Sequence, residues 1–110
     1  MLQDFFIRCD GKYIRVDTGE IRYIESVKNY VRIVTITKSW LVLMSLRQLE
    51  EELPQAKFCR VHRSFIVSLS HIRSFDQDSV YLDDTTIPIN PLYKQVLQSR
   101  VKVLVSDYAK

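Results

Sequence analysis

The chain alternates short apolar runs with polar turns, and this pattern predicts a protein built mainly of β-strands. Residues 5–9 and 12–17 are separated by Asp10-Gly11, a dipeptide typical of tight β-hairpins. Further strand-like runs cover residues 21–27, 30–37, 40–44, 58–72, 79–83 and 86–89. With about eight such runs and no strand–helix–strand alternation, the pattern favours an antiparallel β domain over a parallel α/β fold.

One short helix is predicted in the middle of the chain. Ser45 and Gln48 have the spacing of a helix-capping box, and Pro54 ends the segment. Its apolar face would comprise Leu46, Leu49 and Leu53. This pattern indicates a short amphipathic helix that packs on a sheet.

A second helix is predicted near the C-terminus. Asn90 has the position of an N-cap and Pro91 that of the first helical residue. Apolar residues then recur at helical spacing at Leu92, Val96 and Leu97. Residues 99–110 fit either a helix or a strand. We also expect both glycines, Gly11 and Gly19, to occupy turn positions with positive φ.

Charge is distributed unevenly along the chain. With 110 residues, net charge +3 and a pI near 8.9, the sequence fits one mildly basic domain spanning residues 1–110. Residues 54–75 contain no Asp or Glu, and their basic residues and histidines are Lys57, Arg60, His62, Arg63, His71 and Arg73. A surface that contacts phosphate groups has this composition.

Motifs for catalysis are absent from the sequence. It contains no GxGxxG, GxxxxGK[ST], GxSxG or HExxH, so we expect no enzyme and no cofactor. Cys9 and Cys59 lack a CxxC partner and are expected to be reduced, buried thiols. A metal site from Cys59, His62 and His71 is a weaker alternative. No signal peptide or membrane span is recognisable, and we expect a cytoplasmic protein.

Three polar segments are candidates for nucleic-acid contact, because they offer donors for phosphates and amides or guanidinium groups for base edges. The candidates are Lys28, Asn29, Tyr30 and nearby Arg32; Arg60, His62, Arg63 and Ser64; and Asn90 with Lys94 at a helix N-terminus, where free N–H groups attract anions. Neither helix has the basic residues of a recognition helix, so contacts should come from loops.

Within the second segment, strand alternation limits how many side chains can face DNA. Arg60 and His62 face one way and Arg63 the other, unless the chain kinks near His62 to Ser64. One of the cations could therefore be structural, and His62 is equally a candidate for a hydrogen-bonded structural residue. Glu25 is expected to bind a neighbouring cation or a backbone N–H of the protein and not to act as a ligand itself.

Four ordered motifs resemble the LytTR family of bacterial DNA-binding domains. They are Tyr-Ile-Glu-Ser-Val-Lys-Asn-Tyr-Val at residues 23–31, the Leu46…Leu49…Leu53-Pro54 helix, Phe-Cys-Arg-Val-His-Arg-Ser-Phe-Ile-Val at 58–67 and Ile-Pro-Ile at 87–89. The resemblance covers about residues 7–97. It implies an elongated fold of small β-sheets with one or two short helices, which binds promoter DNA through loops that enter successive major grooves.

The resemblance also implies biological partners and contact positions. Such domains are usually C-terminal output domains of two-component response regulators, so a receiver domain is expected in the full-length protein, and two copies typically bind direct repeats. Base contacts are implied for Lys28-Asn29-Tyr30, for Ser68, where the family usually has Asn, and for the loop at Asn90 with Lys94 further on.

Two other functions are compatible with the sequence. A β-rich protein-interaction module could dock an acidic partner through its basic face, which the modest net charge would suit. Single-stranded RNA binding would need exposed aromatic residues in a basic groove, and the predicted strand phases bury most of them.

Overall fold

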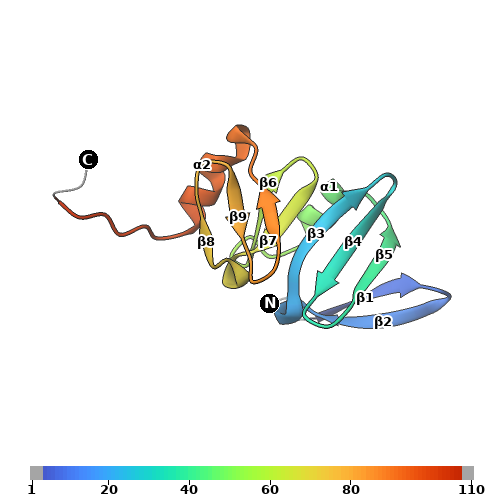
Figure 1. The fold of residues 1–110 in the computed structure, drawn as a ribbon. Helices are drawn as coiled ribbons and strands as arrows, with labels where there is room; N and C mark the ends of the chain where they lie inside the picture. The colour runs from blue at the N-terminus through green and yellow to red at the C-terminus, as the bar shows by residue number, and fades with distance from the viewer. Residues whose placement is uncertain (1–3, 108–110) are drawn as a thin grey trace.

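The computed structural model describes residues 4–107, which form ten β-strands, two α-helices and two short 3-10 turns (Figure 1). The elements are β1 (Asp4–Cys9), β2 (Lys12–Asp17), a 3-10 turn (Thr18–Glu20), β3 (Ile21–Val27), β4 (Tyr30–Thr35), β5 (Ser39–Leu43), α1 (Leu46–Glu52), β6 (Phe58–His62), β7 (Phe65–Ser68), a 3-10 turn (Leu69–His71), β8 (Ser74–Phe75), β9 (Ser79–Tyr81), β10 (Thr86–Pro88) and α2 (Pro91–Arg100). The predicted mainly β class is confirmed.

The strands form three small antiparallel sheets. Their strand orders are β1-β2, β5-β4-β3-β7-β6 and β10-β9-β8. The count exceeds the predicted number because residues 58–72 turn back on themselves as the β6–β7 hairpin instead of forming one kinked strand, and because β8 was not predicted. The molecule measures 57 × 27 × 25 Å, with the extended segment after α2 adding to its length (Figure 1).

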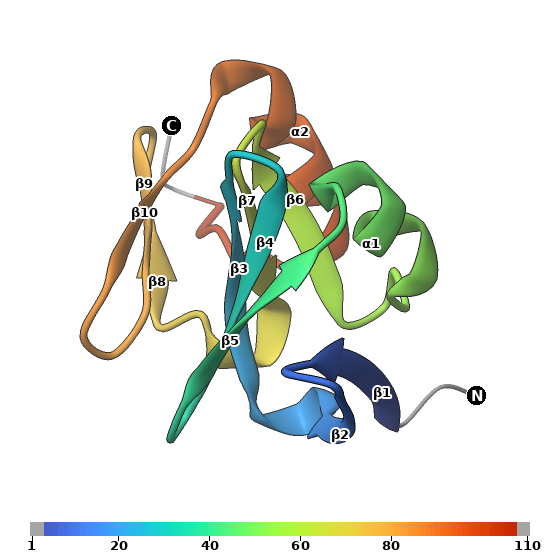
Figure 2. The ribbon, with the colours of Figure 1, turned by 90° about the vertical axis from the view of Figure 1, so that its right-hand side faces the viewer.

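The five-stranded sheet is the middle layer and packs against a hydrophobic core on each face (Figure 2). Ile24 and Ile66 point into the core that the sheet shares with α1 and the β1–β2 hairpin. Val61 and Val67 point into the opposite core, with β9 and α2. Neighbouring residues Ile66 and Val67 thus enter different cores, as the alternation of a strand requires.

A bulge changes which residues of β3 are buried. Strict alternation predicts that Ile21 and Ile24 face opposite sides of the sheet. Both are fully buried in the same core, because the β3–β4 register shifts between Ile21 and Tyr23. The extra residue in the bulge allows Ile21 and Ile24, which are three positions apart, to point into the same core.

The turns follow local sequence signals, with one correction. Asp10 and Gly11 have φ of 53° and 75° and join β1 to β2, as predicted. Gly19 does not have a positive φ, which corrects the expectation for that glycine. It lies in the 3-10 turn, where its N–H donates to Asp17 Oδ1 at 2.8 Å, and an added Cβ would lie 3.3 Å from that oxygen.

Helix α1 matches its prediction closely. Ser45 is the N-cap, and its Oγ accepts the Gln48 N–H at 3.0 Å. The three leucines of the predicted apolar face, Leu46, Leu49 and Leu53, are buried. The helix therefore packs one face on the sheet and leaves Glu50, Glu51 and Glu52 exposed.

Helix α2 matches its predicted start but not its predicted apolar face. Asn90 is the N-cap and Pro91 the first residue. Leu97 is fully buried, whereas Leu92 and Val96 are 84% and 36% exposed. The Arg100 guanidinium fixes the end of the helix by donating to the carbonyl oxygens of Gln55 and Phe58 at 2.8 and 2.9 Å. Residues 101–106 then continue as an extended segment, neither helix nor strand.

Neither α-helix within residues 4–107 is long and apolar enough to cross a membrane.

We predict that Ser45→Ala lowers the free energy of unfolding by about 1 kcal/mol, because the Gln48 N–H loses its acceptor. Urea unfolding followed by circular dichroism measures this change. Ser39→Ala is the matched control, because the Ser39 side chain is exposed and has no hydrogen bond within the described chain. Equal stability of the two variants would contradict the capping role.

Candidate nucleic-acid interface

The structure gathers the three predicted polar segments at one end of the molecule, which we call the turn end. It comprises the β3–β4 turn (Lys28 and Asn29), the β6–β7 turn (Arg63 and Ser64) and the N-cap Asn90. The Ser26 N–H donates to the Ser64 carbonyl at 2.8 Å, and the Asn90 N–H donates to the Val61 carbonyl at 2.9 Å. In both ribbon views these three turns lie at the top (Figures 1 and 2).

The β3–β4 turn presents a cation and an amide to solvent. Val27 pairs with Tyr30, so Lys28 and Asn29 form a two-residue turn. Both side chains are exposed, and neither makes a hydrogen bond or ion pair with residues 4–107. Lys28 has φ of 56°, a conformation that costs a residue with a Cβ roughly 1 kcal/mol or more. Two-residue hairpin turns require a positive φ, and residues strained in this way are common at functional positions.

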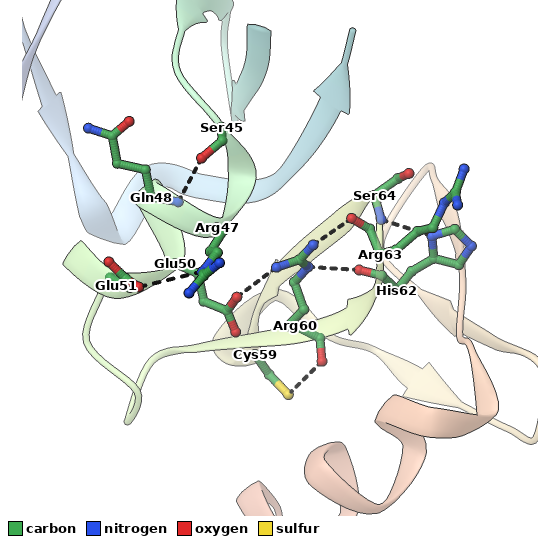
Figure 3. Close-up of polar contacts among 10 residues, drawn as sticks. All are labelled: Ser45, Arg47, Gln48, Glu50, Glu51, Cys59, Arg60, His62, Arg63 and Ser64. Atoms are coloured by element: carbon green, nitrogen blue, oxygen red, sulfur yellow. Dashed lines mark hydrogen bonds and ion pairs between the residues drawn. The ribbon is translucent and has the colours of Figure 1, made fainter. Parts of the chain in front are cut away.

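The β6–β7 turn is ordered by His62. Its Nδ1 accepts the Ser64 N–H at 3.0 Å, which places the ring proton on Nε2 in the neutral tautomer. The ring also meets Phe65 edge-on, with 5.6 Å between centroids. His62 therefore has the structural role that the sequence left open. Arg63 is exposed, and its guanidinium has no partner among the described residues (Figure 3).

Arg60 is placed differently from Arg63. Its guanidinium donates to the carbonyls of His62 and Arg63 at 2.9 and 2.6 Å and to Glu50 Oε1 at 2.6 Å (Figure 3). The side chain is only 15% exposed. In place of the expected kink near His62 to Ser64, the chain makes the β6–β7 turn, in which Arg63 is exposed and Arg60 faces the protein.

Arg32 lies on β4 beside the turn end and is paired across the strands with Glu25. Its Nη1 donates to Glu25 Oε1 at 3.3 Å, and both side chains are partly exposed. This contact confirms the expectation that Glu25 holds a neighbouring cation. It also means that part of the positive charge of Arg32 is already balanced within the protein.

The start of α2 offers fewer donors than the sequence suggested. Pro91 has no N–H, the Leu92 N–H donates to Asn90 Oδ1 at 2.9 Å, and the Tyr93 N–H donates to the Asn90 carbonyl at 2.8 Å. The expectation of free N–H groups at this helix start is therefore corrected, because the two oxygen atoms of Asn90 accept the N–H groups of Leu92 and Tyr93. Lys94 donates to Gln77 Oε1 in the β8–β9 turn.

Acidic residues that were not assigned to the site lie beside α2. The Ile89 N–H donates to the Asp78 carbonyl at 2.8 Å, which brings the β8–β9 turn next to Asn90. Asp76 accepts from the Asp78 and Ser79 N–H groups and from the Tyr81 hydroxyl at 2.8 to 3.0 Å. These hydrogen bonds, the one from Asp78 first, lower the pKa of Asp76 and keep it ionised. The unopposed positive charge is thus concentrated at Lys28 and Arg63.

Ser68 lies away from the turn end and is only 3% exposed. It is the last residue of β7, at the opposite end of that strand from Ser64, and its Oγ lies 3.2 Å from Ser70 Oγ. A buried hydroxyl cannot reach a base edge from this position. The implied contact at Ser68 is therefore corrected, and we leave the residue out of the interface.

The cysteines are both free, but they differ in burial. Cys59 is buried and Cys9 only partly so, which corrects the expectation for Cys9. Burial raises the pKa of the Cys59 thiol and keeps it protonated. Within residues 4–107, no three His, Cys, Asp or Glu side chains are grouped so that they could hold a metal ion.

The sequence and the fold of this chain both match those of known proteins. A family model described as the LytTr DNA-binding domain matches residues 11–102. A solved LytTr DNA-binding domain from a Bacillus cereus response regulator has the same fold, with a TM-score of 0.77 and 21% identity over 91% of this chain and 97% of that one.

Longer regulators also match in sequence. Sensory transduction protein LytT is similar to this chain in Bacillus subtilis, at 31% identity over 80% of the chain, and in Bacillus anthracis, at 29% over 82%. The CO-responsive transcriptional regulator RcoM of Rhodospirillum rubrum is 40% identical over 54% of the chain and 25% of its own length. The chain spans 39% of the length of each LytT protein. The chain belongs to the LytTR family of DNA-binding domains.

Proposed function

We propose that this chain binds double-stranded DNA with sequence preference and that it does so through the turn end. One observation carries the proposal. Three turns from distant parts of the sequence lie side by side, and two of them present exposed cations, Lys28 and Arg63, that have no partner within the described chain. A protein surface with unpaired cations on adjacent tight turns suits the phosphate backbone of a duplex.

The residue types suggest a division of roles. Lys28 and Arg63 would contact phosphates, and Arg63 can do so with two parallel hydrogen bonds. Asn29, which follows Lys28 in the same turn and has no hydrogen bond within the described chain, has the donor and acceptor that pair with an adenine edge in the major groove. The Asn90 side-chain oxygen caps α2, so its contribution would come from the amide nitrogen. Tyr30, Arg32, Ser64 and Lys94 border these groups.

The relatives suggest the setting in which the domain acts. Their names describe sensory transduction and transcriptional regulation, and this chain spans 39% of each LytT protein. We infer a cytoplasmic transcription regulator in which this domain reads promoter DNA, a receiver domain accepts the signal, and two copies bind direct repeats.

The first test is salt dependence. Affinity for duplexes of suitable promoter sequence should fall with salt, with a log–log slope of about −1.8 for the two proposed phosphate contacts. Arg63→Ala should weaken binding to all sequences alike and reduce the magnitude of this slope by about 0.9. Fluorescence anisotropy at several salt concentrations measures both. Arg15→Ala, which removes an exposed arginine of the β1–β2 hairpin, is the charge-matched control and should change little. No binding at low salt, or an affinity that does not depend on salt, would contradict the proposed phosphate contacts.

The second test concerns base preference. Asn29→Ala should alter which duplexes are selected from a randomised pool, at a cost of about 1–3 kcal/mol for the preferred base, while leaving the salt slope nearly unchanged. Sequencing of the selected pools for wild type, Asn29→Ala and Arg63→Ala gives the comparison. If Asn29→Ala reduces the affinity for all sequences equally, Asn29 does not read a base.

The third test uses the strained turn. Lys28→Gly should raise the free energy of unfolding by about 1 kcal/mol, because glycine accepts a φ of 56° without a clash, yet it should weaken DNA binding by removing a phosphate contact. Urea unfolding and anisotropy on the same samples measure the two effects. Lys28→Ala separates them, since it loses the charge and keeps the strain. Tighter DNA binding by Lys28→Gly would contradict the proposed contact.

A further inference from the structure

Arg60 uses its guanidinium group inside the protein, at the base of the β6–β7 turn. Nε donates to the His62 carbonyl at 2.9 Å, Nη2 donates to the Arg63 carbonyl at 2.6 Å, and Nη1 meets Glu50 Oε1 at 2.6 Å. The guanidinium carbon also lies 5.9 Å from the centre of the Tyr93 ring. These contacts join α1, the β6–β7 turn and α2 through one side chain. Figure 3 shows the contacts with Glu50 and with the two carbonyls.

The turn needs such a partner because the strand ladder is interrupted there. The β6–β7 register shifts between Arg60 and His62, which leaves Val61 as the extra residue of a bulge. The Val61 carbonyl accepts from Asn90, and the carbonyls of His62 and Arg63 accept from Arg60. The planar guanidinium can serve two neighbouring carbonyls at once, which an ammonium group cannot do with the same geometry.

We propose that Arg60 is a positioning residue for DNA binding, with Glu50 as the anchor that fixes it. Arg60 holds the turn so that the Arg63 side chain projects outward toward phosphate, and Arg60 itself does not contact DNA. This inference rests on the proposed function of the turn end. Three of the five guanidinium N–H groups of Arg60 are engaged within the protein, and its side chain is only 15% exposed, so phosphate has little access to it.

Removal of Glu50 distinguishes a phosphate contact by Arg60 from a positioning role, because the two roles predict opposite changes in DNA affinity. If Arg60 contacted phosphate, removal of Glu50 would free Arg60 and remove a negative charge, and DNA would bind more tightly. If Arg60 positions the turn, removal of Glu50 releases the guanidinium and loosens the turn, and DNA binds more weakly. Glu52 lies on the same helix, is exposed and has no hydrogen bond or ion pair within the described residues, so Glu52→Ala controls for charge alone.

Conservative replacement of Arg60 is a second discriminating variant. Arg60→Lys keeps the positive charge and would preserve a simple phosphate contact. The lysine ammonium cannot serve the two carbonyls with the geometry of the guanidinium. The positioning role therefore predicts that Arg60→Lys lowers DNA affinity about tenfold, close to the loss for Arg60→Ala. The effect of Arg60→Lys should shrink in an Arg63→Ala background, because the group that is positioned has gone.

The experiment measures duplex affinity by anisotropy and, in the DNA-free protein, amide hydrogen exchange at Ser64, whose N–H donates to His62 Nδ1. Glu50→Ala should weaken binding and speed Ser64 exchange, and Glu52→Ala should do neither. Equal or tighter binding by Glu50→Ala, or additive effects of Arg60→Lys and Arg63→Ala, would overturn the positioning role. If the wild type binds no duplex at low salt, the proposed function fails, and exchange at Ser64 still decides whether Arg60 and Glu50 hold the turn.

Discussion

The pairing of β3 with β7 is the constraint on which the rest of the structure depends. It joins residues about forty positions apart, with Glu25 opposite Phe65 and Tyr23 opposite Val67. This pairing completes the five-stranded sheet, and both hydrophobic cores need that sheet as their shared wall. It also fixes the ends of the two hairpins beside each other through the Ser26–Ser64 hydrogen bond. The turn end is therefore a consequence of sheet register.

The parts of the fold that depend on neighbouring residues could be predicted from the sequence. Asp10-Gly11 specified a hairpin, Ser45 specified the start of α1, and Asn90-Pro91 specified the start of α2, because each signal acts within a few residues. Two of the three candidate loops, at Lys28-Asn29 and at Asn90, were also located, because these polar residues lie between strand-like or helical runs. The third lies within residues 58–72, where the alternation indicated a single strand rather than a hairpin. That the loops meet at one end could not be predicted, because it follows from the β3–β7 register.

The errors in residue roles arise where the alternation of a strand is interrupted or where partners come from distant segments. The bulge at Arg22 shifts the facing of Ile21, and a bulge depends on the partner strand rather than on local sequence. Arg60 was misjudged because its guanidinium is engaged by Glu50 of α1 and by the carbonyls of the β6–β7 turn. The implied contact at Ser68 failed for a related reason: its burial depends on the packing around the end of β7, which the motif alone does not describe.

The distribution of charge at the turn end sets a limit on how the domain can bind. Arg32, Arg60 and Lys94 are engaged by Glu25, Glu50 and Gln77, which leaves Lys28 and Arg63 as the cations of the turn end without an acceptor in the described chain. The two phosphate contacts that we propose would provide a small counterion-release term, so one copy alone should bind DNA weakly at physiological salt. Two linked copies on adjacent sites would multiply their affinities, because the second contact forms at high effective concentration. If one copy binds DNA weakly, DNA binding would be regulated by the process that brings two copies together.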